Sequence, residues 1–139
     1  PYRRQRQMCI RDREVIKHLK DRGFEVTDYG CDSTASCDYP IYGKAVAEAI
    51  AAGKQDLGIL ICGTGIGMSM VANKVEGVRA ALCSDCFSAQ ATREHNNANV
   101  LCMGARTIGP GLALMIVDKF VDTPFSNDER HVRRIKMFS

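Results

Sequence analysis

The chain has 139 residues, of which 45% are hydrophobic and 25% charged, proportions typical of a soluble globular protein with one domain over 1–139. Its formal charge of +3 and its shortage of aromatic residues, five Phe, four Tyr and no Trp, do not favour nucleic-acid binding. No apolar run approaches the roughly 18 residues that cross a bilayer, so we expect a cytoplasmic protein with no membrane partner.

The cysteines are odd in number and follow no zinc-ribbon or zinc-finger spacing; the seven lie at positions 9, 31, 37, 62, 83, 86 and 102. Cys83 and Cys86 match a Cys-x-x-Cys pattern, for which a redox or zinc role is one interpretation. No second Cys or His pair completes such a site. We therefore expect mostly buried free thiols in a reducing compartment and no metal site.

The N-terminal residues 1–12 show neither helical nor strand periodicity. We expect them to be foreign to the fold, although their arginines also suit a basic arm that binds RNA. Apolar residues then recur at helical spacing from Arg13 to a stop at Gly23, and the alternation over 24–29 predicts a strand. A polar loop of small residues follows over 30–38.

A second helix is predicted through 45–52, because Pro40 suits a first helical turn and Gly53 a helix end. Asp38 is expected to cap this helix. Tyr39 stands at its entrance, where the hydroxyl could face a ligand or the ring could simply pack against its neighbours. The sequence leaves both interpretations open.

The chain is organised around residues 57–73. A short apolar run rich in β-branched residues ends at Cys62 and suits a strand buried on both faces. A turn of alternating glycines follows, before a helical pattern resumes over 68–74; its residues are Gly63, Thr64, Gly65, Ile66 and Gly67. Glycines let the main chain bend sharply and approach a ligand, and the first N–H groups of a helix attract anions.

This glycine turn does not have the spacing of the common nucleotide-binding motifs. It lacks the G-x-G-x-x-G of dinucleotide folds and the Gly-Lys-Ser/Thr of a P-loop, so NAD and nucleoside triphosphates are disfavoured. What remains is a thiol, Cys62, and a hydroxyl, Thr64, at the end of a strand beside main-chain donors. This arrangement suits chemistry that develops a negatively charged oxygen.

The second half of the chain continues the alternation. The run 78–83 predicts another buried strand, Asp85 caps a helix through 89–94, and residues 95–99 break that helix before a short strand at 100–103. His95 either caps the helix end or acts in catalysis, and we favour the second. A strongly apolar helix follows over 109–121.

Two basic positions follow these elements. Arg106 comes directly after the strand at 100–103. Arg130 and Arg134 lie in a C-terminal tail that can form a helix, where their spacing puts them on one face and suits a phosphate; a solvated basic tail is the other interpretation.

Strands alternating with helices predict an α/β fold: a three-layer, doubly wound, Rossmann-like parallel sheet of about five strands with a C-terminal helical tail. Ligands of such sheets bind at the carboxyl ends of the strands. We therefore expect Cys62, Thr64, Arg106 and the His95 loop to lie near one edge of the sheet.

Several stretches together make the chain resemble the type B ribose-5-phosphate isomerase family, which includes the galactose-6-phosphate isomerase subunits. They are Asp38-Tyr39-Pro40, Cys62-Gly63-Thr64-Gly65-Ile66-Gly67, Ala72-Asn73-Lys74, Ser88-Ala89-Gln90, His95-Asn96, Asn99-Val100-Leu101, Gly104-Ala105-Arg106 and Arg130-His131. The resemblance covers about 13–138, and the Cys-Gly-Thr-Gly-x-Gly stretch is its most specific part.

The resemblance implies an aldose–ketose isomerase for ribose 5-phosphate and ribulose 5-phosphate that needs neither metal nor organic cofactor. Cys62 would move a proton between C2 and C1 through an enediolate, and His95, helped by Thr64, would open the furanose ring. Main-chain donors of Gly63, Gly65, Ile66, Gly67 and Asn96 would hold the enediolate, and Arg106, Arg130 and Arg134 would hold the phosphate or nearby oxygens. Tyr39, from its position at the helix entrance, is a further candidate for substrate binding. The resemblance also implies a homodimer with shared sites, to which the Arg130 tail contributes.

One departure from the family pattern is visible at the N-terminus. The family begins with an apolar strand that ends in an Asp-His pair, whereas this chain has Gln5-Arg6 there, and 3–7 looks too polar for a central strand. We therefore predict that this chain is destabilised or weakly active. An isomerase of a six-carbon sugar phosphate (allose or galactose 6-phosphate) and a catalytically impaired sugar-phosphate-binding protein remain alternatives.

Overall fold

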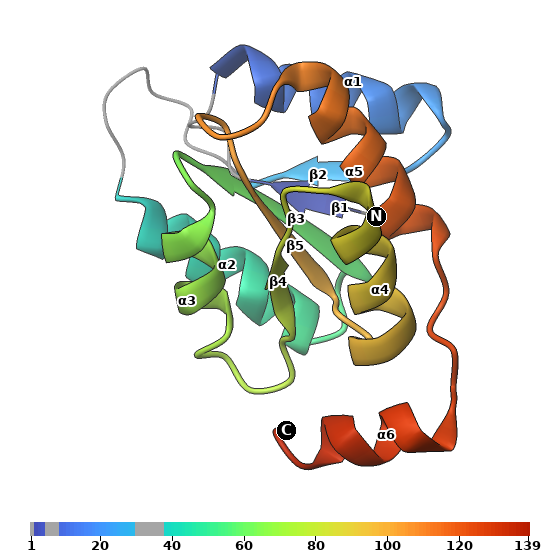
Figure 1. Ribbon diagram of the computed structural model, residues 1–139. Coiled ribbons are helices and arrows are strands. Elements are labelled where there is room, and N and C mark those ends of the chain that lie inside the picture. Colours follow the sequence, from blue (N-terminus) through green and yellow to red (C-terminus); the bar gives the residue numbers. More distant parts are fainter. Residues whose placement is uncertain (1, 5–8, 30–37) are drawn as a thin grey trace.

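In the described part of the chain, five parallel strands form the sheet, in the order β2-β1-β3-β5-β4 (Figure 1). The computed structural model describes residues 2–4, 9–29 and 38–139. The strands are β1 Tyr2–Arg4, β2 Val26–Asp28, β3 Leu57–Cys62, β4 Ala80–Leu82 and β5 Val100–Gly104.

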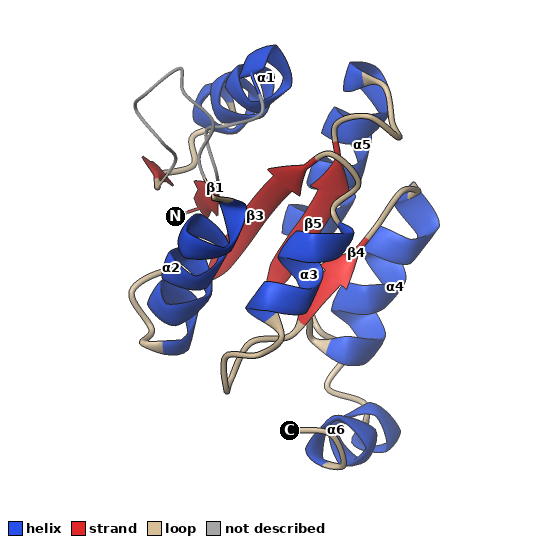
Figure 2. Cartoon of the chain, turned by 90° about the vertical axis from the view of Figure 1, so that its left-hand side faces the viewer, coloured by secondary structure: helices blue, strands red, loops and turns tan. Residues whose placement is uncertain are grey.

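Helices cover both faces of this sheet. Successive side chains of a strand point to opposite faces, and because apolar residues of β3 lie on both, each face needs a covering layer. Ile59 and Ile61 join one core, which α1 (Cys9–Asp21), α4 (Cys86–Asn96) and α5 (Pro110–Asp122) cover. Leu60 joins the other, which α2 (Tyr39–Ala51) and α3 (Ile66–Ala72) cover (Figure 2). The predicted three-layer, doubly wound α/β fold is confirmed.

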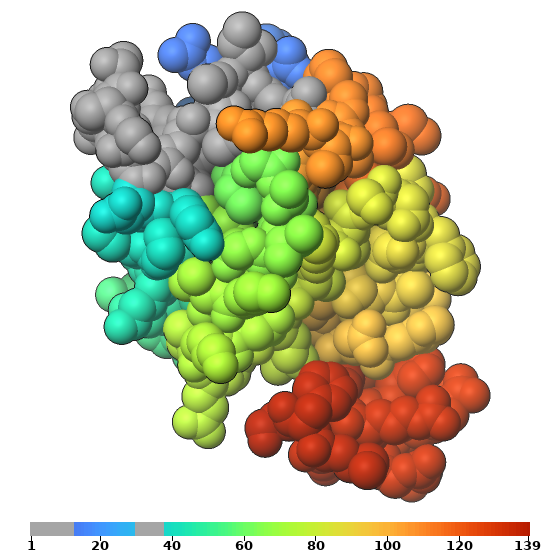
Figure 3. Space-filling model, turned by 60° about the vertical axis from the view of Figure 1, so that its left-hand side comes forward, coloured from blue at the N-terminus to red at the C-terminus, as the bar shows by residue number. Residues whose placement is uncertain are grey.

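The C-terminal helix α6 (Glu129–Lys136) lies outside these layers. Figure 1 shows it below α4, at the end of the molecule away from the arrowheads of β3 and β5, and Figure 3 shows the same segment at the lower end of the molecule. Asp128 caps it by accepting a hydrogen bond from the N–H of Arg130 at 2.9 Å. The predicted helical tail is therefore present.

The N-terminal strand differs from our expectation. Tyr2–Arg4 pairs with both β2 and β3, although the sequence analysis treated 1–12 as foreign and 3–7 as too polar for a central strand. The reason is that main-chain N–H and C=O groups make the hydrogen bonds between strands, so a polar sequence can also pair with neighbouring strands. Helix α1 also starts at Cys9 rather than Arg13. Gln5-Arg6 lies outside the described residues.

Two further expectations need correction. The strand in 78–83 is an edge strand rather than a buried one, because β4 pairs with β5 alone in the described sheet, and Leu82 is 42% exposed. Asp38 occupies the N-cap of α2 but makes no side-chain capping bond, whereas Asp85 accepts one from the N–H of Ser88 at 2.7 Å, as predicted. The polar loop at 30–37 lies outside the described residues.

None of the helices in the described part of the chain is long and apolar enough to cross a bilayer.

Candidate active site

Cys62 is the last residue of β3, at the carboxyl edge of the sheet. The residue is half-buried, and its sulfur accepts a hydrogen bond from the main-chain N–H of Gly65 at 3.1 Å. A donor aimed at sulfur stabilises negative charge there. The thiol is therefore placed at a surface where it can meet a ligand.

Gly65 makes this hydrogen bond possible by turning the chain back. Its φ of +81° is in the left-handed region, and a Cβ there would lie 2.5 Å from Leu82 Cδ1 and 2.8 Å from the carbonyl carbon of Met103. Only glycine satisfies both conditions. The N–H of Ser69 donates a hydrogen bond to the carbonyl of Gly65, which is the first such bond of α3. The N–H of Gly67 comes before this bond in the chain and therefore has no partner within α3.

Thr64 and Arg106 flank the same turn. The Thr64 hydroxyl accepts a hydrogen bond from the N–H of Ile66 at 3.3 Å, and the Thr64 residue is exposed. The N–H of Arg106 donates to the carbonyl of Gly63 at 2.9 Å, and a Cβ on Gly63 would lie 3.6 Å from Arg106 Cδ. The arginine side chain therefore crosses over the glycine turn and brings positive charge to it.

Tyr39, at the start of α2, reaches the turn from the other side. Its hydroxyl occupies the space that a Cβ on Gly67 would need. The ring therefore packs against the turn, and with 38% of the residue exposed the side chain also borders solvent. We call the residues gathered here the turn cluster: Tyr39, Cys62, Gly63, Thr64, Gly65, Ile66, Gly67 and Arg106.

His95 does not lie with the turn cluster, which corrects our expectation that its loop shares their edge. Helix α4 begins after β4 at the carboxyl edge and runs back, so His95, in its last turn, lies at the amino edge where β5 begins. A five-residue strand separates the two edges by about 16 Å. Within one chain, the two groups therefore face different ends of the sheet (Figure 2).

The amino edge carries its own group of polar and basic residues. His95 and Asn96 end α4, while Arg130 and Arg134 are exposed on α6, which lies beside that helix end. Arg130 lies 3.9 Å from an oxygen of Asp128. We call these four residues the arginine cluster; their positive charge and exposed donors suit a phosphate.

His131 lies behind the arginine cluster, and the sequence analysis did not single it out. Its ring lies against that of His95, with centroids 4.5 Å apart, and the residue is only 8% exposed. Burial, the neighbouring His95 and nearby arginines hold the pKa of His131 below its usual value of 6.5. In the sequence, its only signal was its place in the Arg130-His131 stretch.

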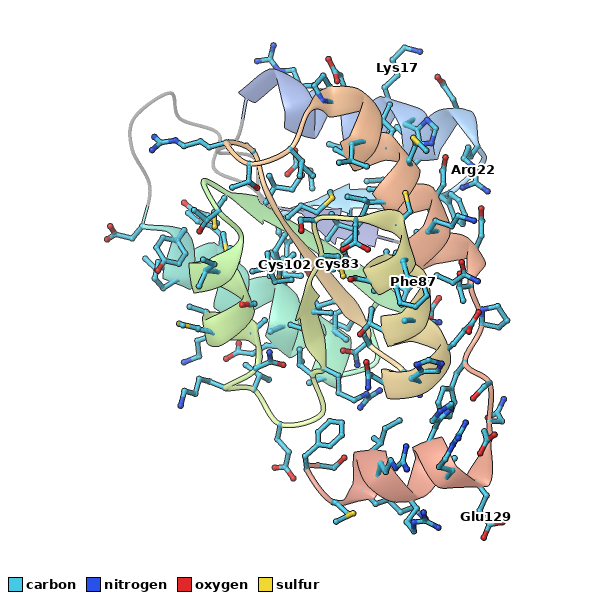
Figure 4. The ribbon with its side chains drawn as sticks, viewed as in Figure 1. Lys17, Arg22, Cys83, Phe87, Cys102 and Glu129 are labelled. Atoms are coloured by element: carbon cyan, nitrogen blue, oxygen red, sulfur yellow. The ribbon has the colours of Figure 1, made fainter. Side chains whose placement is uncertain are left out.

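Cys83 and Cys102 differ from Cys62 in their surroundings, because both are buried. Burial raises the pKa of Cys83 to about 11 and raises the pKa of Cys102 still further (Figure 4). Both are therefore protonated at neutral pH and poor nucleophiles, which argues against the redox interpretation of Cys83 and Cys86. Among the described residues no cluster of three His, Cys, Asp or Glu is placed to hold a metal ion.

A groove of about 870 Å³ runs along the exposed edge of β4, between the end of α3, helix α4 and the C-terminus. Leu82, Phe87 and Phe138 line it and are 42%, 79% and 60% exposed. Neither Cys62 nor Arg106 borders this groove. It therefore presents apolar surface beside the turn cluster, with Leu82 lying between the groove and Gly65.

The sequence pattern of the Ribose/Galactose Isomerase family matches residues 8–138. The chain belongs to this family. It is accordingly a sugar-phosphate aldose–ketose isomerase, and the match includes α1 and every element after it.

Named relatives in the ribose/galactose isomerase family differ in their substrates. Ribose-5-phosphate isomerase B of Escherichia coli is 48% identical over 123 residues, which cover 88% of this chain and 82% of that protein. D-erythrulose-4-phosphate isomerase of Pectobacterium atrosepticum is 49% identical over 112 residues, covering 80% and 74%. Family membership therefore establishes the reaction class, while relatives of equal similarity are named for different sugars.

Solved structures of ribose/galactose isomerases match the whole fold. Ribose-5-phosphate isomerase B of Clostridium thermocellum is 44% identical with a TM-score of 0.92, over 98% of this chain and 91% of that one. The Mycoplasma genitalium enzyme with bound ribulose-5-phosphate is 39% identical with a TM-score of 0.90, over 98% and 90%.

Proposed function

We propose that this chain interconverts D-ribose 5-phosphate and D-ribulose 5-phosphate, with Cys62 as the base. The observation that carries the proposal is the hydrogen bond from the N–H of Gly65 to the half-buried Cys62 sulfur, in a turn that Arg106 crosses. A homologue with ribulose-5-phosphate bound and a relative named ribose-5-phosphate isomerase B support the choice of substrate.

The proton transfer would use the turn cluster. The Cys62 thiolate takes the proton from C2 of the open-chain aldose, and the electron pair of that C–H bond moves to give an enediolate. The thiol, whose proton exchanges with solvent, then gives a proton to C1, while the proton of the C2 hydroxyl moves to the C1 oxygen, which yields the ketose. Since a C–H bond beside a carbonyl is much less acidic than a thiol, stabilisation of the enediolate oxygens by main-chain N–H groups such as that of Gly67 must supply the larger effect.

Ring opening and phosphate binding would use the arginine cluster of a second copy. His95 gives a proton to the ring oxygen as the C1–O4 bond breaks, and the C1 hydroxyl releases its proton to water, which leaves the open-chain aldehyde. Arg130 and Arg134 bind the phosphate. Because Cys62 and His95 face opposite edges of one sheet, a single substrate needs these groups from two chains. We therefore propose a homodimer in which each site combines the turn cluster of one chain with the arginine cluster of the other.

The groove beside β4 is the surface we propose for this contact. An exposed strand edge tends to pair or to be covered, and exposed aromatic residues are enriched in interfaces. Phe87, in the first turn of α4 (Figure 4), is 79% exposed beside that edge. A Phe87→Asp substitution should therefore convert a dimer into monomers in analytical ultracentrifugation and abolish activity. An active monomer would exclude shared sites.

The chemistry is tested by solvent deuterium. With ribose 5-phosphate in D₂O, the protein should form ribulose 5-phosphate that carries deuterium at C1, and Cys62→Ala should lower turnover by about 10²- to 10⁴-fold. Cys86→Ala, which removes another half-buried thiol, is the matched control and should stay active. A protein that binds ribose 5-phosphate but neither isomerises nor exchanges it would be a sugar-phosphate-binding protein instead.

Complementation tests the shared site. A Cys62→Ala chain and a His95→Asn chain are each inactive as homodimers, but a mixed dimer would contain one intact site. An equal mixture should therefore recover about a quarter of the wild-type activity, because half of the dimers are mixed and each has one of two sites. No recovery after unfolding and refolding the two variants together would show that each active site uses Cys62 and His95 of one and the same chain.

The substrate is tested by comparing kcat/KM for ribose 5-phosphate, allose 6-phosphate, galactose 6-phosphate and erythrose 4-phosphate. We expect the five-carbon sugar to give the highest value. A higher kcat/KM for a six-carbon sugar phosphate would leave the proposed reaction in place and show that ribose 5-phosphate is not the preferred substrate.

A further inference from the structure

The two imidazole rings at the amino edge form a contact between α4 and α6. The His95 side chain is 48% exposed, whereas His131 is almost fully buried behind it, with ring centroids 4.5 Å apart and ring planes inclined by 39°. His95 therefore has a solvent-facing side and a side that lies on a second ring.

His131 is itself held in place by the strap 123–128, which joins α5 to α6. Its Nδ1 lies 2.9 Å from the Ser126 hydroxyl, and the N–H of Ser126 donates to the carbonyl of Glu94 at 3.2 Å. Arg93 Nε also donates to the carbonyl of Thr123 at 3.1 Å. The strap thus ties the His131 ring to the same helical turn that carries His95.

The electrostatic surroundings favour a neutral His131. Burial, His95 and the charges of Arg130 and Arg134 lower the pKa of His131, and only Asp128 opposes them. A neutral ring can stay packed against His95 in either protonation state of His95, since no like charge then faces it. This property suits a support for a group that gains and loses a proton.

We propose that His131 is a positioning residue for His95, fixing the imidazole that opens the furanose ring. The inference rests on the proposed function, in which His95 carries that step. Without His131, the exposed His95 side chain at a helix end would sample several rotamers, and the loss of fixed geometry slows a positioned proton transfer. Proton transfer by Cys62 needs neither ring.

The two directions of the reaction separate these steps. Ribose 5-phosphate is a furanose that must be opened, whereas ribulose 5-phosphate has its phosphate on the hydroxyl that would close a ring and is open-chain. Exchange of the C1 hydrogen of ribulose 5-phosphate with D₂O therefore tests Cys62 without ring opening. The same exchange also tests the proposed function by itself.

His131→Ala should lower kcat for ribose 5-phosphate by about 10- to 100-fold, while C1 exchange of ribulose 5-phosphate changes by less than about threefold. His131→Phe keeps a ring in the same place and should retain most of the activity. Ser126→Ala frees the His131 ring and should give a smaller loss in the same direction. In NMR spectra, the ring protons of His95 should lose the upfield shift caused by the stacked ring in His131→Ala and keep it in His131→Phe.

Equal losses in both reactions of a folded His131→Ala protein would overturn the proposal, because His131 would then serve the whole site. A higher KM with unchanged kcat would also overturn it and assign His131 to phosphate binding. If His131→Ala does not fold, His131→Phe provides the test. Full C1 exchange but little turnover of ribose 5-phosphate in His131→Phe would overturn the proposal, because a ring in the same place would then not be enough to support His95. A wild-type protein without C1 exchange would refute the proposed function instead.

Discussion

The main-chain N–H of Gly65 donates a hydrogen bond to the sulfur of Cys62, three residues earlier in the chain, at 3.1 Å. This bond closes the turn between β3 and α3 and directs a donor at the thiol. The conformation depends on the left-handed φ of Gly65. The position of one sulfur atom is therefore coupled to the main-chain geometry of one glycine.

Gly65→Ala should lower the free energy of unfolding by about 1–3 kcal/mol and reduce turnover strongly, because Ala is strained at this φ and its Cβ would overlap Met103 and Leu82. Gly111→Ala, in the first turn of α5, is the control: a Cβ there meets nothing within 4 Å. It should be neutral or slightly stabilising. Urea denaturation measures both, and an equally stable Gly65→Ala protein would contradict the structure.

Thiol alkylation should distinguish Cys62 from the buried cysteines. At neutral pH iodoacetamide should modify Cys62 while Cys83 and Cys102 remain unmodified, because burial raises the pKa of both buried thiols and blocks access. Peptide mapping by mass spectrometry after timed quenching gives the order of modification. Modification of Cys102 before Cys62 in the folded protein would refute the assigned environments.

His131 should make stability depend on pH. Burial lowers its folded-state pKa below the usual 6.5, so below that pH the unfolded chain binds more protons than the folded one. This contribution to stability is complete above about pH 6.5 and is lost as the pH falls toward the folded-state pKa. The melting temperature should therefore drop as the pH falls below about 6.5, and drop less in His131→Phe. An identical pH profile in the two proteins would contradict this prediction.

Helices α1 and α5 are joined by an ion-pair cluster centred on Asp118. One of its oxygens lies 2.7 Å from His18 Nε2 and 2.8 Å from Arg22 Nη1, and Arg22 also reaches Asp122 at 2.7 Å (Figure 4). Asp118→Ala should lower the free energy of unfolding by about 1 kcal/mol, less at high salt.

The control for this cluster is Asp21→Ala. Asp21 pairs with Lys17 within α1 at 2.7 Å, and both side chains are more than 60% exposed, at 63% and 78%. Its loss should cost about 0.3 kcal/mol. Equal effects of the two substitutions in urea denaturation would show that Asp118 does not join the helices.

The sequence was sufficient to predict the part of the turn cluster that runs from Cys62 to Gly67. A buried strand, a run of alternating glycines and a helix follow one another within 57–73, and each pattern is local, so it predicts its own conformation and the meeting of Cys62 with main-chain donors. The alternation of strands and helices also predicted the three-layer parallel sheet, because right-handed connections leave few other arrangements.

The tertiary structure decided what no local pattern contains. His95 follows Cys62 by 33 residues, and only the direction of α4 across the sheet puts it at the opposite edge. Tyr2–Arg4 pairs with β2 and β3 because these two strands offer main-chain hydrogen-bonding groups on both sides of it. The contact of His131 with His95 needs the strap to fold back onto α4, and such long-range placement is set by packing, for which periodicity carries no signal.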